Sequence, residues 1–175
     1  MKIQGEDFIL RPFQITDKKA LAKYANNEKI GKNLRDRFPY PYTEEDAEWF
    51  INFVLENNVP LRNFIIEINN EAVGTIEFRP GEDVYRLNAE IGYWLGEEYW
   101  GKGIMTAVIK ETVKYIFENS DINRVFALPF STSIASARAL EKAGFIKEAT
   151  IRKGVIKNGK VLDYYIYSII NFENI

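Results

Sequence analysis

Two glycines mark the stretch of this chain whose residue types and spacing could do chemistry. Gly101 and Gly103 stand on either side of Lys102. The residues after them recur at the spacing of one helix face, namely Met105, Val108, Ile109, Thr112 and Ile116. The first N–H groups of a helix lack partners within it and, with the positive end of the helix dipole, suit a phosphate or pyrophosphate. The same spacing also fits a glycine-containing turn before an ordinary core helix.

A strand leads into this loop. Its side chains alternate with period two, with Ile91, Tyr93 and Leu95 on one face and Glu90, Gly92 and Trp94 on the other. The whole stretch, E-I-G-Y-W-L-G-E-E-Y-W-G-K-G-I-M-T, resembles the coenzyme A loop of the GNAT acetyltransferase superfamily, in which loop amides bind the pyrophosphate of acetyl-CoA. The family pattern has Gln or Arg where this chain has Glu98. The residues of this stretch most resemble those of the branch that contains the ribosomal-protein N-terminal acetyltransferases.

A second stretch carries the same resemblance. P-F-S-T-S-I-A-S-A-R-A-L-E-K-A-G-F resembles the second GNAT signature, with Ser136 at the family's serine and Ser133 where many members carry a coenzyme-touching asparagine. Many members place a tyrosine acid at the position of Leu140, whereas the ribosomal-protein branch lacks it and a serine is implicated instead. Ser136 is therefore the predicted proton donor to the departing thiolate. The alternative is a helix-start hydroxyl that satisfies backbone donors.

Together the two stretches predict a coenzyme site. Its residues are Tyr93, Trp94, Leu95, Trp100, Gly101, Lys102, Gly103, Ile104, Met105, Thr106 and Ser133. Within this set, Lys102 either meets a coenzyme phosphate or is a solvated loop lysine.

The chemistry implied by the resemblance is a direct attack of an amine on the thioester, because the chain has no Cys to carry an acyl group. A base must take the proton of the amine, and without His the candidates are carboxylates, tyrosines and ordered water. Glu90 lies on the strand leading to the loop and is the candidate base, directly or through water. The other interpretation pairs Glu90 with an Arg on a neighbouring strand. A backbone N–H near Tyr93 to Leu95 would polarise the thioester oxygen.

Two functions from different classes remain open at this point. The first is an acetyl-CoA-dependent N-acetyltransferase that works in a ternary complex. The second is a non-catalytic acyl-CoA-binding or sensing domain on the same fold. A nucleotide-binding domain is a weak third, because consecutive hairpin strands replace the alternating β-α units it needs. The acceptor is a primary amine, either a protein N-terminus or a small molecule such as a polyamine, an amino acid or an aminoglycoside.

Composition sets the outer bounds. A length of 175 residues, 46% hydrophobic and 27% charged, predicts a single acetyltransferase domain over residues 1–175, as a monomer or homodimer. The net charge of −2 argues against nucleic-acid and membrane-surface partners. The absence of Cys and His excludes disulfides and thiolate sites and removes the commonest metal ligand, so no metal is expected. No stretch suits a membrane span or a signal region, which predicts a cytoplasmic protein.

The elements that must position these groups follow from the pattern. Strands are expected over residues 8–13, 64–68, 72–78, 86–95 and 124–128, with two more around Asn158-Gly159, and helices over 101–119 and 133–143. The crossover from 86–95 to 124–128 makes that strand pair parallel. The predicted fold is α/β (α+β), a mixed, mostly antiparallel sheet of about seven strands with helices on both faces. The resemblance to the GNAT superfamily implies in addition a splayed parallel pair forming the acetyl-CoA cleft.

Two further segments precede the first hairpin. Residues 28–42 break the pattern and contain the run Phe38-Pro39-Tyr40-Pro41-Tyr42, which is either an irregular connection with packed aromatics or a substrate-facing loop. Thr43 then caps a helix, with Asp46 three residues on. The predicted buried face of that helix consists of Ala47, Phe50, Ile51, Val54 and Leu55.

Overall fold

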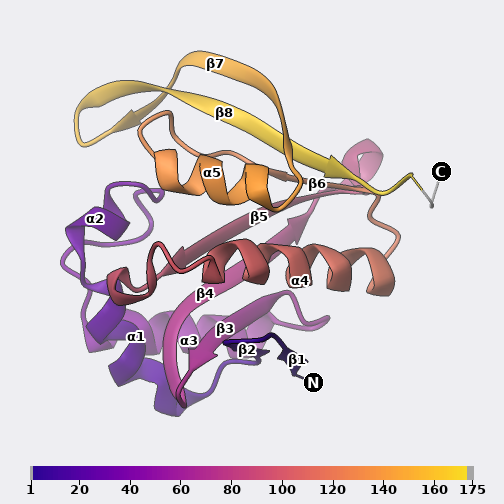
Figure 1. Ribbon diagram of the computed structural model, residues 1–175. Helices are drawn as coiled ribbons and strands as arrows, with labels where there is room; N and C mark the ends of the chain where they lie inside the picture. Colours follow the sequence, from indigo (N-terminus) through magenta and orange to yellow (C-terminus); the bar gives the residue numbers. More distant parts are fainter. Residues whose placement is uncertain (1, 173–175) are drawn as a thin grey trace. The chain divides into compact units, whose positions relative to one another are not determined.

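The computed structural model describes residues 2–172, and Figure 1 labels its helices and strands. The strands are β1 (Ile3–Gln4), β2 (Ile9–Arg11), β3 (Asn63–Ile68), β4 (Glu71–Pro80), β5 (Asn88–Leu95), β6 (Arg124–Ala127), β7 (Ile146–Lys157) and β8 (Lys160–Ile170). The α-helices are α1 (Lys18–Ala25), α2 (Glu28–Gly31), α3 (Glu44–Asn57), α4 (Ile104–Asn119) and α5 (Ile134–Lys142). The 3₁₀ turns are η1 (Ile15–Asp17), η2 (Asp83–Tyr85) and η3 (Glu97–Tyr99).

The strands form one mixed sheet in the order β1-β2-β3-β4-β5-β6-β8-β7. The β5–β6 pair is parallel, from Asn88↔Arg124 to Glu90↔Phe126, whereas β6 pairs with β8 and β7 with β8 in antiparallel fashion. The predicted fold class is confirmed, with eight strands in place of about seven. The extra strand, β1, has two residues, too few to show a period of two. The cleft expected beside the parallel pair stays a prediction.

The chain packs as two compact units, each described here by itself. The first comprises the residues up to Glu77 together with Tyr93–Val108, and the second comprises Phe78–Gly92 and the residues from Ile109 onward. In the first unit, β1 to β4 form an antiparallel ladder. Its β3–β4 turn uses Asn69 and Asn70, both with positive φ (51° and 63°), as a two-residue hairpin requires. In the second unit, Asn158 and Gly159 (49° and 74°) form the predicted β7–β8 turn.

Helix α3 begins with the predicted cap. The Thr43 side chain accepts from the Asp46 N–H at 3.2 Å, and the Asp46 carboxylate accepts from the Thr43 N–H at 2.8 Å, which completes the capping box. Ala47, Ile51 and Val54 are buried as expected. Leu55 was predicted to be buried and is 49% exposed, because it lies about 100° around the helix from Val54 and beyond the edge of the core stripe.

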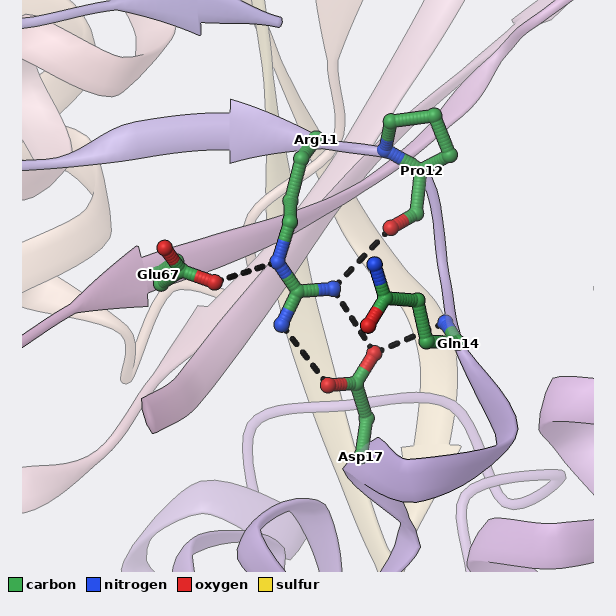
Figure 2. A network of polar contacts seen from close by, with 5 residues as sticks. All are labelled: Arg11, Pro12, Gln14, Asp17 and Glu67. Atoms are coloured by element: carbon green, nitrogen blue, oxygen red, sulfur yellow. Dashed lines mark hydrogen bonds and ion pairs between the residues drawn. The ribbon is translucent and has the colours of Figure 1, made fainter. Parts of the chain in front are cut away.

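A buried polar network ties β2 to the start of α1, and Figure 2 shows its members. The Arg11 guanidinium binds the Asp17 carboxylate at two points, 2.7 and 2.8 Å, donates to the Pro12 carbonyl at 3.0 Å and pairs with Glu67 on β3. Asp17 also accepts from the Gln14 N–H at 2.8 Å. The hydrogen bond to Asp17, followed by the one to Glu67, raises the pKa of Arg11 above its ordinary value. The network therefore fixes the end of β2 against both the helix and the neighbouring strand.

The two edge strands of the sheet, β1 and β7, differ in length and regularity. β7 stands last in the order, and its register with β8 shifts between Ile151 and Val155. Within this shift Lys153 has a φ of 53°, and its N–H donates to the Asp163 carboxylate at 2.8 Å. The geometry is that of a β-bulge, which bends and twists the strand. At the other end stands the two-residue strand β1.

Candidate active site

The predicted coenzyme loop lies between the end of β5 and the start of α4. Gly101 and Gly103 have φ of 74° and 79°, and a Cβ on either glycine would meet no atom within 4 Å. These positions therefore require glycine for their backbone conformation, which L side chains rarely adopt, and their surroundings are open. Helix α4 was expected to begin near Gly101 but begins at Ile104, since two left-handed glycines cannot belong to a right-handed helix.

The first turn of α4 contains backbone N–H groups that have no partner within the helix. The Ala107 N–H is bonded to the Gly103 carbonyl at 3.1 Å, which makes Gly103 the residue that flanks the helix. The N–H groups of Ile104, Met105 and Thr106 belong to this first turn, where an α-helix offers them no carbonyl. A pyrophosphate fits this arrangement, because amides, an open approach and the helix dipole coincide at one point.

The loop is anchored to the strand that precedes it. The Trp100 indole N–H donates to the Leu95 carbonyl at 2.7 Å, and the Gly96 N–H donates to the Val73 carbonyl of β4 at 2.8 Å. A Cβ on Gly96 would lie 2.7 Å from the Tyr24 ring, so that only glycine allows this close approach of α1. Trp100 was predicted as a coenzyme contact, and its indole N–H has a structural role as well.

Residues of α1 and of the start of α2 contact the η3 turn. Asn27 donates to the Glu97 carboxylate at 2.8 Å, and Lys29 forms an ion pair with the same group. The hydrogen bond from Lys29, followed by that from Asn27, lowers the pKa of Glu97. The rings of Tyr24 and Tyr99 meet edge to face with centroids 5.8 Å apart. No sequence pattern predicts these contacts, because about 70 residues separate the partners and no local period links them.

Two other predictions concern residues near the loop. Lys102 is exposed, and its ammonium lies 5.5 Å from the centre of the Tyr99 ring, so that its contact with a phosphate stays a prediction. In the aromatic segment 28–42, Phe38 packs against Tyr42 and against Trp94 of β5, at 4.9 and 5.9 Å between ring centroids. This segment is therefore partly a packed connection, and its contact with substrate also stays a prediction.

Glu90 belongs to the second unit and lies on β5 opposite Phe126 of β6. Its carboxylate accepts from the Arg79 guanidinium of β4 at 3.4 Å. This is the arginine pair that the sequence left open as an alternative. The side chain keeps 19% of its surface exposed. The pairing is long for a hydrogen bond, and a role as base stays a prediction beside it.

Helix α5 places the two predicted serines. Ser133 is buried and flanks the helix, with its N–H bonded to the Phe130 carbonyl at 2.8 Å. Ser136 is the third helical residue and half-buried, one turn from the N-terminus. Leu140 is fully buried, so the position where many family members carry a tyrosine is a core position here. Gly144, with φ of 99°, follows the helix and ends it.

The predicted site residues thus fall into two groups. Those from Tyr93 to Thr106 all belong to the first unit, where the structure brings them together around one loop. Glu90, Ser133 and Ser136 belong to the second unit.

The loop geometry and the strand order can be compared with known families. A model of the GNAT acetyltransferase domain matches residues 7–146. This chain belongs to the GNAT acetyltransferase family. The match spans both signature stretches, so the resemblance noted in the sequence is confirmed over the residues that carried it. No helix of this acetyltransferase within residues 2–172 is long and apolar enough to cross a membrane.

Relatives of this GNAT acetyltransferase have similar lengths. The uncharacterized N-acetyltransferase p20 of Bacillus licheniformis is 27% identical over 173 residues, 96% of this chain and 95% of p20. The ribosomal-protein-serine acetyltransferase of Escherichia coli (strain K12) is 25% identical over 130 residues, 73% of this chain and 72% of that protein. A solved GNAT-family acetyltransferase from Bacillus anthracis has a TM-score of 0.83 at 27% identity, covering 97% of this chain and 98% of that chain.

Family membership confirms the predicted activity, an N-acetyltransferase with acetyl-CoA as donor. It favours this enzyme over the non-catalytic acyl-CoA-binding domain, because the relatives are named for the transfer reaction.

Proposed function

We propose that this enzyme acetylates the N-terminal amine of a protein, with a ribosomal protein as the first candidate. The coenzyme loop, with its two open, left-handed glycines before α4, supports the acetyl-CoA half of the reaction. The choice of acceptor is supported by the match to the ribosomal-protein-serine acetyltransferase over about three quarters of the chain. A single acetyltransferase domain, a cytoplasmic location and a monomeric or homodimeric state belong to the same proposal.

The roles of the residues follow the chemistry of amine acetylation. Acetyl-CoA supplies an activated acyl group and a thiolate leaving group. The amides from Trp100 to Met105 would hold the pyrophosphate, and a backbone N–H from the end of β5 would polarise the thioester oxygen. Glu90, on β5 in the second unit, would take the proton of the amine directly or through water. Ser136 on α5 would give a hydrogen bond or proton to the departing thiolate.

A thiol-release assay with acetyl-CoA tests the acceptor. Peptides that carry the N-termini of ribosomal proteins are compared with a polyamine, an amino acid and an aminoglycoside. We expect turnover on at least one free N-terminus, and none on the same peptide with a blocked N-terminus. Turnover restricted to the small amines would contradict the proposed acceptor and leave the acetyltransferase activity intact.

The kinetic order is a second expected result. Because the chain contains no cysteine, no thiol can hold the acetyl group between donor and acceptor. Initial rates measured against both substrates should give intersecting lines, as a ternary complex requires. Parallel lines, or an acetyl-enzyme detected by intact mass after incubation with acetyl-CoA alone, would rule out direct transfer.

Substitutions at Glu90 and Ser136 separate catalysis from structure. Ser136→Ala should lower kcat by ~10²-fold or less, because a thiolate is already a good leaving group. Glu90→Gln should lower kcat most at low pH, where the protonated amine dominates. The matched control is Arg79→Gln, which breaks the same ion pair without touching the carboxylate.

The structural alternative makes a different set of predictions. If Glu90 only pairs with Arg79, then Glu90→Gln and Arg79→Gln should lower the melting temperature alike and leave the rate per folded molecule unchanged. Thermal unfolding and kcat measured on the same preparations decide between the two accounts. Full kcat in both Glu90→Gln and Ser136→Ala across the pH range would remove the catalytic assignment.

A further inference from the structure

The outer face of α3 exposes two large aromatic side chains next to each other. Trp49 is 68% exposed and Phe53 is 50% exposed. Their rings are stacked, with centroids 5.7 Å apart and an interplanar angle of 10°. Residues four apart in a helix lie on the same side of it. Clustered exposed aromatic side chains are uncommon on a protein that has no partner, and they mark interaction sites.

Carboxylates flank this aromatic pair on both sides. Glu45 precedes Trp49 by four residues and Glu56 follows Phe53 by three, so that all four share one face of the helix. We call these four residues the acidic aromatic face. The sequence of α3, EEDAEWFINFVLEN, has acidic residues in both its first and last turns and contains neither Lys nor Arg.

The other acidic residues of α3 are engaged within the fold. Asp46 caps the helix through Thr43, and Glu48 forms an ion pair with Lys18 of α1 at 2.8 Å. Glu45 forms no ion pair within residues 2–172. The same holds for Glu56 in the described part of the chain. Their charges are therefore available to a partner, on either side of an apolar surface.

We propose that the acidic aromatic face binds a basic amphipathic segment of the acceptor protein. Apolar side chains of the segment would cover Trp49 and Phe53, while its Lys or Arg side chains would meet the carboxylates of Glu45 and Glu56. The inference rests on the proposed protein acceptor. A second copy of this chain is disfavoured as occupant, because a symmetric contact would place the same carboxylates against one another.

The test is a binding measurement that does not depend on turnover. The probe is a synthetic amphipathic helix of Leu and Lys, labelled for fluorescence anisotropy and N-terminally blocked so that it cannot accept an acetyl group. We expect it to bind, more weakly at high salt, whereas the matched helix of Leu and Glu does not. Trp49→Ser with Phe53→Ser should weaken binding at least about tenfold. Glu45→Lys with Glu56→Lys should also weaken it and flatten the salt dependence.

The matched control is Tyr85→Ser, which removes a 69% exposed aromatic side chain from the η2 turn. It should bind the probe like the unchanged protein. Equal binding by the Trp49/Phe53 variant, or an equal loss in the Tyr85 variant, would overturn the proposal. So would a dimer in sedimentation that the Trp49/Phe53 variant converts to a monomer, because the face would then be covered by a second copy.

Measurements of KM test whether the acidic aromatic face contributes to binding of the acceptor. A free N-terminal peptide extended by the Leu/Lys helix should show a lower KM than the peptide alone, and the Trp49/Phe53 variant should lose that advantage while keeping the KM of the short peptide. If no peptide is acetylated but the probe still distinguishes the variants, the proposed acceptor fails and the docking face stands. If peptides are acetylated and the probe binds all variants alike, the docking face fails and the acceptor stands.

Discussion

Replacing Gly103 by valine should lower the affinity for coenzyme A by roughly 10²-fold. The φ of 79° places this residue in the left-handed region, where a β-branched side chain is strained. Relief of the strain turns the backbone amides away from the position that a pyrophosphate needs. Each lost charge-assisted hydrogen bond costs about 1.5 to 3 kcal/mol, so the loss of two bonds is enough for a 10²-fold drop in affinity, which corresponds to about 2.8 kcal/mol. Calorimetric titration with coenzyme A measures the change.

Gly159 provides a matched control for this variant. It has a φ of 74°, and a Cβ there would also meet no atom within 4 Å, but it lies in the β7–β8 turn. Gly159→Val therefore introduces the same kind of strain at a site with no predicted contact to the coenzyme. We expect it to lower the melting temperature and to leave coenzyme affinity unchanged. If Gly103→Val kept full affinity, the assignment of the pyrophosphate to this loop would be wrong.

Replacing Arg11 by methionine should remove about 3 to 5 kcal/mol of the free energy of unfolding. The substitution leaves the Asp17 and Glu67 carboxylates without their shared cation, and their side chains are only 7% and 13% exposed. The network shown in Figure 2 has no second guanidinium to replace it. Urea denaturation of the variant and the unchanged protein gives the difference directly.

Charge rather than packing should account for most of this loss. Methionine keeps most of the apolar stem of the arginine and removes the guanidinium, so that the loss reports the two carboxylates left without a cation. Lys18→Met is the matched control, because it breaks the half-exposed pair with Glu48 and should destabilise the fold far less than the loss of the buried cation. If the two variants lost the same stability, the buried network would be worth no more than a surface ion pair.

The parts of the fold that the sequence predicted are those with a local cause. The turn at Asn158-Gly159 follows from residues that tolerate positive φ, and the α3 cap follows from Thr43 and Asp46. The left-handed backbone at Gly101 and Gly103 has a local cause as well, whereas the η3 turn before it is held by the distant residues Asn27 and Lys29. The parallel β5–β6 pair followed from the helix that joins the two strands.

The parts that could not be predicted depend on residues far apart in the chain. Arg11 meets Glu67 across 56 residues, and Asn27 meets Glu97 across 70, so that no period or motif contains both partners. The exposure of Trp49 likewise could not be predicted from the local sequence. Helix periodicity indicates which residues share a face of α3, whereas the width of the buried stripe is set by what packs against it.

The bulge at Lys153 has a consequence for how copies of this enzyme behave when concentrated. An outermost strand offers unpaired N–H and C=O groups to any other strand, and a long flat one templates aggregation. In β7 the register break at Ile151/Val155 and the exposed cations Arg152 and Lys153 interrupt that template near its middle. At the opposite margin β1 offers only two residues. Both margins of the sheet are thus poor starting points for strand addition, and the enzyme should resist fibril formation.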